Sequence, residues 1–285
     1  MFQYLSFPIY VVYSMHWQEE TGKMAQQFFA AGDRHMYDWF SDYSQAKTED
    51  IGVGSALMEI VEDSAPAYFQ EAKDYENAIK QSLDKIFSTT IGKWLFTMLN
   101  PDVKVFILPN PYLKGQTAMT SRVLTAKQGG GIRISFNPKP WGNMADDALI
   151  HELTHALRRG TNRYTLVAGL PIGDFPSSEE FFAVQISNIY RSSLRKTGLY
   201  EEYYSGTASS DMGSIYSDFA DTPASIVVLK YFLDFEPLAR HLALLPIGKP
   251  SYNPFRDFPI LERKALGKGQ SPGQRAQPFM YLKAG

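Results

Sequence analysis

The sequence predicts an α+β fold in which a small mixed sheet accompanies a mostly helical remainder. Two short runs, at residues 103–108 and 132–136, have the β-branched and aromatic residues that are typical of strands. Several longer stretches carry apolar residues at the three- and four-residue spacing of amphipathic helices. The chain has 285 residues, of which 44% are hydrophobic, so it can bury a sizeable core.

Residues 1–90 are expected to form a mostly helical accessory region, or else part of the same core as the rest. Helical periodicity runs from about residue 49 to residue 96, with a break near Pro66. Two apolar stripes mark its buried side: Ala56, Leu57, Ile60 and Val61, then Ile79, Leu83, Ile86 and Phe87. Asn100-Pro101 ends this helical region.

A second domain is expected over residues 91–245, and its first half supplies the strands. Val103–Leu108 predicts a short strand that Pro109 ends. The polar, glycine-rich residues 112–131 indicate a loop or an irregular hairpin. Ile132–Phe136 then alternates apolar and polar residues, which predicts a half-buried strand.

Three helices are expected after these strands, and an irregular tail over residues 246–285. The clearest helix covers about Met144–Arg159, with Asn143 as N-cap and Gly160 as the residue after its end. Acidic residues open this helix and basic residues close it, as the helix dipole favours: Asp146, Asp147, Arg158 and Arg159. The other helices are predicted over residues 178–196 and 222–244, and the tail is rich in Pro, Gly and Lys.

Charge and composition limit the partners of the protein. The 28 basic and 30 acidic residues give a net charge of −2, so we expect no nucleic-acid partner. No apolar run is long enough for a membrane span, and Met1–Trp17 lacks the features of a signal peptide. Because the chain has no cysteine, any metal must be bound by His, Asp or Glu.

Residues 151–155 read His-Glu-Leu-Thr-His, which is the motif H-E-x-x-H. On a helix, residues four apart lie on one face, so His151 and His155 can bind one Zn²⁺ ion together. Glu152 is rotated by about 100° around the axis and can act as general base beside the metal. The flanks favour a buried helix over a solvated surface helix, since they are apolar: Ala148, Leu149, Ile150, Leu153, Ala156 and Leu157.

A catalytic zinc ion needs a third protein ligand, for which Glu180 is the candidate. None of the other histidines follows the motif at close spacing. Glu180 lies on the next predicted helix, and Glu179 is assigned to the dipole of the first turn. Farther along this helix, three polar residues either support the metal ligands or contact a neighbouring helix: Ser187, Asn188 and Arg191. Several tyrosines are eligible by type as oxyanion donors: Tyr164, Tyr190, Tyr203, Tyr204 and Tyr216.

The motif with a downstream Glu-Phe-Phe-Ala resembles the gluzincin family of zinc metallopeptidases. Residues 179–183 are similar to the third-ligand region of anthrax lethal factor, and residues 91–190 are similar in organisation to metalloprotease effectors secreted by bacteria. The resemblance implies a zincin-like domain, zinc bound by His151, His155 and Glu180, and Glu152 as the catalytic base. Several gluzincins have an acid four residues after the ligand glutamate, where this chain has Val184. A ligand histidine therefore needs another group to orient it.

The expected function is hydrolysis of peptide bonds in a protein substrate by a zinc-dependent endopeptidase. We expect a soluble bacterial effector or toxin, secreted without a signal peptide and delivered into a target cell, with a secretion chaperone or an immunity protein as candidate partner. Three alternatives stay open: a cytoplasmic housekeeping metallopeptidase, hydrolysis of a non-peptide amide, and a non-catalytic binding module that contains zinc. The strand Ile132–Phe136 is expected either to border the cleft and pair with an extended substrate, or to be an internal strand of the sheet.

Overall fold

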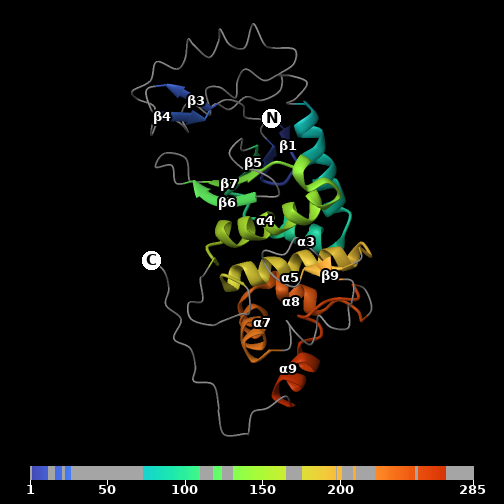
Figure 1. Ribbon diagram of the computed structural model, residues 1–285. Helices are drawn as coiled ribbons and strands as arrows, with labels where there is room; N and C mark the ends of the chain where they lie inside the picture. Colours follow the sequence, from blue (N-terminus) through green and yellow to red (C-terminus); the bar gives the residue numbers. More distant parts are fainter. Residues whose placement is uncertain are drawn as a thin grey trace. The chain divides into compact units, whose positions relative to one another are not determined.

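The fold is mixed α+β with a small mixed sheet, which confirms the predicted class. The computed structural model describes residues 2–11, 17–20, 23–26, 73–109, 118–123, 131–164, 175–196, 198–200, 208–209, 222–247 and 250–267. The chain divides into two compact units, whose elements are labelled in Figure 1. Unit 1 consists of Met1–Lys85 with Leu99–Gly160, and unit 2 of Ile86–Met98 with Thr161–Gly285.

Unit 1 contains a five-stranded sheet with the order β1-β2-β5-β7-β6. Its strands are β1 (Phe2–Gln3), β2 (Ile9–Val11), β5 (Lys104–Leu108), β6 (Ala118–Val123) and β7 (Gly131–Phe136). β2, β5 and β7 are parallel, whereas β1 and β6 are antiparallel to their neighbours. A separate antiparallel pair is formed by β3 (Trp17–Glu20) and β4 (Lys23–Gln26). The strands expected over 103–108 and 132–136 are thus confirmed as β5 and β7.

β7 is an internal strand, which excludes one of the two roles expected for it. Its backbone pairs with β5 on one side and with β6 on the other, so it has no edge that could accept a substrate strand. It is also more deeply buried than the alternating pattern predicts, since five of its six residues are buried. Among the described strands, β6 lies at the edge beside β7, in the stretch where the sequence indicated a loop or an irregular hairpin.

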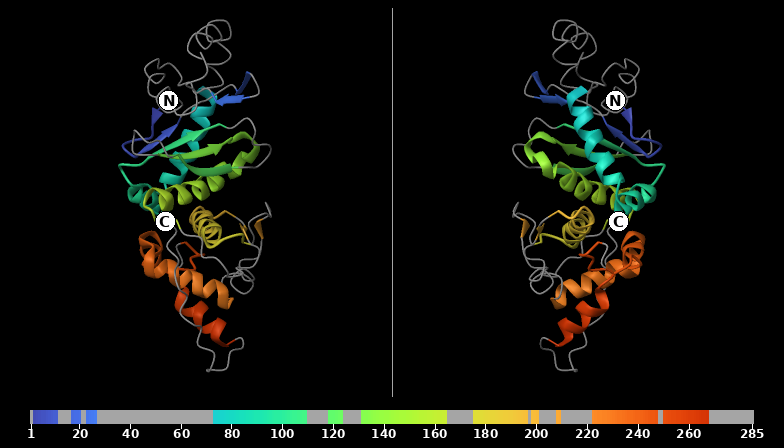
Figure 2. Two further views of the ribbon diagram at one scale, coloured as in Figure 1. Left: turned by 90° about the vertical axis from the view of Figure 1, so that its left-hand side faces the viewer. Right: turned by 90° about the vertical axis from the view of Figure 1, so that its right-hand side faces the viewer.

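The helix α4 (Ala145–Gly160) packs on this sheet against β6 and β7. Figure 2 shows it running along one face of the sheet. The strand registers place Thr120, Ile134 and Ile107 on one face, because partners in register project the same way. The apolar side chains of α4 are buried, among them Leu149, Ile150, Leu153, Ala156 and Leu157. The helix is therefore covered nearly all round, as its apolar flanks predicted.

The ends of α4 differ from the expectation in two details. A short 3-10 helix, η1 (Lys139–Met144), precedes α4 directly, so Asn143 lies inside helical chain and is not its N-cap. Gly160 is the last residue of α4, and the positive φ that ends many helices occurs two residues later, at Asn162 (φ 54°). Asparagine tolerates this conformation better than most residues do.

The helical N-terminal region is described only from residue 73 onward. Residues 73–87 form a helix whose Ile79, Leu83 and Ile86 are buried, as the second apolar stripe predicted. This helix is fixed to the sheet by a hydrogen bond from the Tyr75 hydroxyl to the main-chain oxygen of Phe136 (3.0 Å). The first stripe, over residues 56–61, and the break near Pro66 lie outside the described residues.

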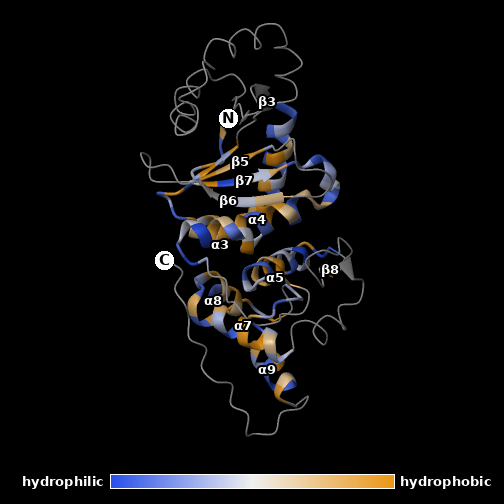
Figure 3. Ribbon diagram, turned by 60° about the vertical axis from the view of Figure 1, so that its left-hand side comes forward, coloured by the Kyte–Doolittle hydropathy of each residue, from blue (hydrophilic) through white to orange (hydrophobic). Residues whose placement is uncertain are grey.

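Unit 2 is mostly helical. Its helices are α3 (Thr90–Met98), α5 (Ser178–Ser193), α7 (Pro223–Phe235), α8 (Pro237–Ala243) and α9 (Phe258–Gly267). The short strands β8 (Leu199–Tyr200) and β9 (Ala208–Ser209) pair with each other. Phe182 of α5 stacks on Phe232 of α7 at 4.2 Å between ring centroids, and Figure 3 shows hydrophobic residues along α7. These buried rings join α5 to α7.

The expectation for the C-terminal part is wrong at two places. A single helix was expected over residues 222–244, but Pro237 divides it into α7 and α8. Glu236, which precedes the proline, has an extended backbone (φ −109°, ψ 114°), as a residue before proline favours. The tail was expected to be irregular, yet residues 258–267 form α9. Within the described part of the chain, no helix has the length and apolarity that crossing a bilayer requires.

Candidate metal centre

The two motif histidines lie one turn apart on α4, within unit 1. Their Nε2 atoms are 3.1 Å apart, and their rings are inclined at 80° with centroids separated by 4.8 Å. His155 is only 5% exposed, whereas His151 is half-buried. The helix therefore brings the Nε2 atoms of a buried and a half-buried histidine close together.

The separation of these nitrogens suits a zinc ion. With Zn–N bonds of about 2.0–2.1 Å, an Nε2–Nε2 distance of 3.1 Å corresponds to an N–Zn–N angle of about 98°. This value is close to the angle in a tetrahedral site, so a small adjustment of either ring is sufficient. His, His and Glu together form one of the usual donor sets of catalytic zinc.

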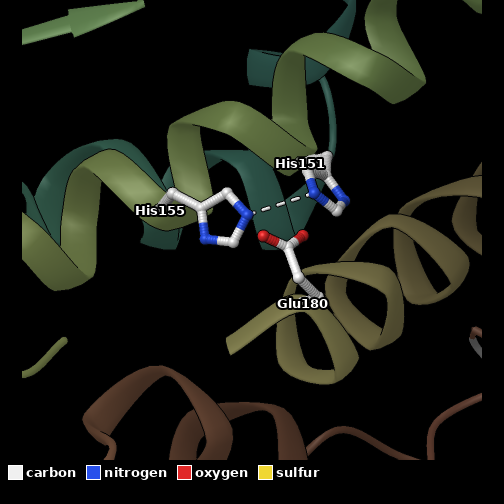
Figure 4. Close-up of side chains that lie close together, drawn as sticks. All are labelled: His151, His155 and Glu180. Carbon is white, nitrogen blue, oxygen red and sulfur yellow. Dashed lines mark hydrogen bonds between the residues drawn. The ribbon is translucent and has the colours of Figure 1, made fainter. Parts of the chain in front are cut away.

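Glu180, the predicted third ligand, belongs to unit 2, whereas both histidines belong to unit 1. Figure 4 draws the two histidines of α4, with a ring nitrogen of each facing the other, and the side chain of Glu180 on α5. A carboxylate of this kind would complete the His-His-Glu donor set of a catalytic zinc site, so the assignment of Glu180 as third ligand stays a prediction.

The local structure of α5 fixes where Glu180 lies within its helix. Ser177 is the N-cap and accepts a hydrogen bond from the main-chain nitrogen of Glu180 (3.2 Å). Glu180 is half-buried in the first turn, whereas the adjacent Glu179 is fully buried. The two glutamates thus differ in burial, while their separate roles, Glu180 as metal ligand and Glu179 at the helix dipole, stay predictions.

Glu152 faces the sheet and contacts Thr120 of β6, a residue that the sequence did not single out. The Thr120 hydroxyl lies 2.5 Å from the Glu152 carboxylate and 3.1 Å from the main-chain oxygen of Glu152. Both side chains are buried, with exposed fractions of 9% and 7%. The sequence indicated a loop or an irregular hairpin for the strand that carries Thr120. The pairing of β6 with β7, which turns Thr120 toward Glu152, could therefore not be inferred from the sequence.

The polar residues farther along α5 form hydrogen bonds with main-chain atoms of the helix and of the segment that follows it. Asn188 donates to the main-chain oxygen of Tyr200 (2.9 Å) and accepts from its nitrogen (2.8 Å). Arg191 donates to the main-chain oxygen of Gly198 (3.0 Å), and Ser187 donates to Ala183 in the previous turn (3.0 Å). The bonds of Asn188 and Arg191 hold the segment around β8, and the bond of Ser187 lies within α5.

The tyrosines suggested as oxyanion donors give no assignment. Tyr190 is fully buried within α5, with the Lys196 ammonium group 5.4 Å from its ring centroid. Such a position is typical of a packing residue. Tyr203, Tyr204 and Tyr216 lie outside the described residues.

No family model, no curated protein and no solved structure matches this chain. The function must therefore be argued from the candidate metal centre and from the fold around it.

Proposed function

We propose that this protein is a zinc-dependent endopeptidase of the gluzincin type, with a zincin-like domain. The observation that carries the proposal is the pair of imidazole nitrogens of His151 and His155, which lie 3.1 Å apart on α4. A buried glutamate, Glu152, adjoins the first histidine on the same helix. A purely structural zinc site has no need of this additional carboxylate.

Each residue of the centre has a distinct task in the proposed reaction. His151, His155 and Glu180 would hold one Zn²⁺ ion, which when bound polarises the substrate carbonyl and makes water more acidic. Glu152 accepts a proton from the water that attacks the peptide carbonyl. It then delivers this proton to the amine nitrogen as the C–N bond breaks, so the water is divided between the two products.

The fold around α4 supports an extended peptide as substrate. β6 lies at one edge of the described sheet and is antiparallel to β7, and its Thr120 contacts the glutamate of the motif. An extended peptide that pairs with the outer edge of β6 would therefore pass close to Glu152. Pairing through main-chain atoms provides affinity, while side-chain pockets provide selectivity. Pairing with an extended substrate, which the sequence suggested for β7, is thus proposed for β6.

The resemblance of the motif segments to secreted bacterial metalloproteases supports the proposal of an effector or toxin that acts on a protein of another cell. A secretion chaperone or an immunity protein would be its partner. New N-termini that appear in a proteome after incubation with the zinc-loaded protein would identify the substrate. A housekeeping peptidase would instead cleave many short peptides and few folded proteins.

The decisive experiment compares wild type with Glu152→Gln. The variant should keep one zinc ion per chain, measured by elemental analysis, and its kcat should fall by a factor of about 10²–10⁴ because the base is lost. If zinc-loaded wild type cleaves no member of a peptide library and no proteome substrate, the peptidase proposal fails and a zinc-containing binding module becomes the better description.

A matched pair of substitutions tests the third ligand. Glu180→Gln should weaken zinc binding strongly, whereas Glu179→Gln should retain one ion per chain, with circular dichroism as the check on folding. If Glu179→Gln loses zinc and Glu180→Gln keeps it, the ligand assignment is wrong.

A further inference from the structure

Thr120 of β6 reaches two oxygens of a single residue on α4. Its hydroxyl lies 2.5 Å from the carboxylate and 3.1 Å from the main-chain oxygen of Glu152. We propose that Thr120 is a positioning residue that holds the Glu152 carboxylate in the orientation a general base requires. This inference rests on the peptidase function proposed above.

The two contacts together locate the carboxylate relative to the helix backbone. The main-chain contact fixes the hydroxyl against α4, and the side-chain contact fixes the carboxylate against the hydroxyl. A glutamate side chain otherwise has several rotatable bonds, whose restriction costs conformational entropy. Because both residues are buried, water competes little for these bonds, and the low polarity strengthens them.

The sheet determines where the hydroxyl lies. Thr120 is opposite Ile134 in the antiparallel pairing of β6 with β7, and neighbouring side chains of a strand alternate between faces. Met119, the preceding residue, is 47% exposed, whereas Thr120 faces α4. The position of the base is therefore coupled to the register of the edge strand.

A hydroxyl suits both states through which a general base passes. It carries one hydrogen and two lone pairs, so it donates to one of the two Glu152 oxygens at a time. While Glu152 is ionised, the hydrogen goes to the carboxylate, because a charged acceptor forms the stronger bond. After Glu152 has taken up the proton, its carboxyl group can donate to the Thr120 oxygen, and the hydroxyl then donates to the main-chain oxygen 3.1 Å away.

Thr120→Val tests this role, because valine preserves the shape and removes the hydroxyl. We expect kcat to fall about 10–100-fold, with KM and the zinc dissociation constant each within about threefold of wild type. Thr120→Ser restores the hydroxyl and should return kcat to within about threefold of wild type. Thr97→Val is the control, since it removes a hydroxyl that donates to the main-chain oxygen of Lys93 (2.8 Å) on α3, a helix that carries no residue of the motif, and it should leave kcat near wild type.

Crystal structures of zinc-loaded wild type and Thr120→Val provide a readout that does not depend on activity. The Glu152 carboxylate should leave its wild-type position in the variant. An unchanged carboxylate position with unchanged kcat would overturn the positioning role, and so would an equal loss of kcat in Thr120→Val and Thr120→Ser. If wild type cleaves no peptide, the peptidase function fails, while the crystal structures still decide whether Thr120 positions Glu152.

Discussion

Gly92 of α3 is the position where a single methyl group should damage unit 2 most clearly. A Cβ atom at this residue would lie 1.9 Å from the main-chain oxygen of Ile86 and 2.5 Å from its carbonyl carbon. The first distance is about 1.5 Å short of the 3.4 Å at which ordinary contact begins. Because the obstacle is backbone, no side-chain rotation can relieve the clash.

The expected cost follows from the bonds around this turn. Thr89 donates to the oxygen of Ile86 (2.7 Å) and accepts from the nitrogen of Gly92 (3.1 Å). Losing both bonds costs about 2 kcal/mol, and overpacking a buried site adds about 1–3 kcal/mol. The higher helix propensity of alanine returns at most about 1 kcal/mol. Gly92→Ala should therefore lower the free energy of unfolding by about 2–4 kcal/mol.

Urea unfolding followed by circular dichroism measures this change, and Gly160→Ala is its control. A Cβ atom at Gly160 would meet Val103 Cγ1 at 3.6 Å, which is ordinary contact, so this variant should be as stable as wild type or slightly more stable. For Gly92→Ala the midpoint should fall by about 1–2 M urea. A midpoint equal to that of wild type would refute the steric reasoning. Since α3 contacts α5, the same variant should also weaken zinc binding through the helix that carries Glu180.

Three further substitutions test the candidate centre and the two units. His155→Ala should abolish stoichiometric zinc binding in equilibrium dialysis, and retention of one ion per chain would contradict the ligand assignment. Tyr4→Phe should remove a loss of stability at alkaline pH: burial, and then the hydrogen bond to Asp84 (2.9 Å) with its negative charge, raise the pKa of the Tyr4 hydroxyl. Above about pH 10 the unfolded chain therefore releases a proton that the folded chain keeps, so the free energy of unfolding of wild type falls as pH rises. Urea midpoints measured across this pH range should fall less in Tyr4→Phe than in wild type. Asn188→Ala should cost about 2–3 kcal/mol in thermal or urea unfolding, because the buried amide loses two bonds to the backbone of the half-buried Tyr200. An unchanged stability would show that water replaces these bonds.

The sequence by itself determined the features that depend on near neighbours in the chain. The H-E-x-x-H spacing placed two imidazoles on one face of a helix, since four residues make about one turn. The helices expected from residues 178 and 222 begin at Ser178 and Pro223, and the residues before them accept a hydrogen bond as N-caps: Ser177 and Thr222. These signals act within a few residues, so no knowledge of the fold is needed to interpret them.

Only the tertiary structure decided which strand forms the edge of the sheet and what Glu152 contacts. Strand order depends on pairing between distant segments, and the same apolar run is compatible with an internal or an edge position. Thr120 and Glu152 are 32 residues apart, and they meet because β6 pairs with β7 in a register that turns the threonine toward α4. The meeting of the two motif histidines was thus predictable from spacing along one helix, whereas the contact between Thr120 and Glu152 became visible only when sheet and helix were seen packed together.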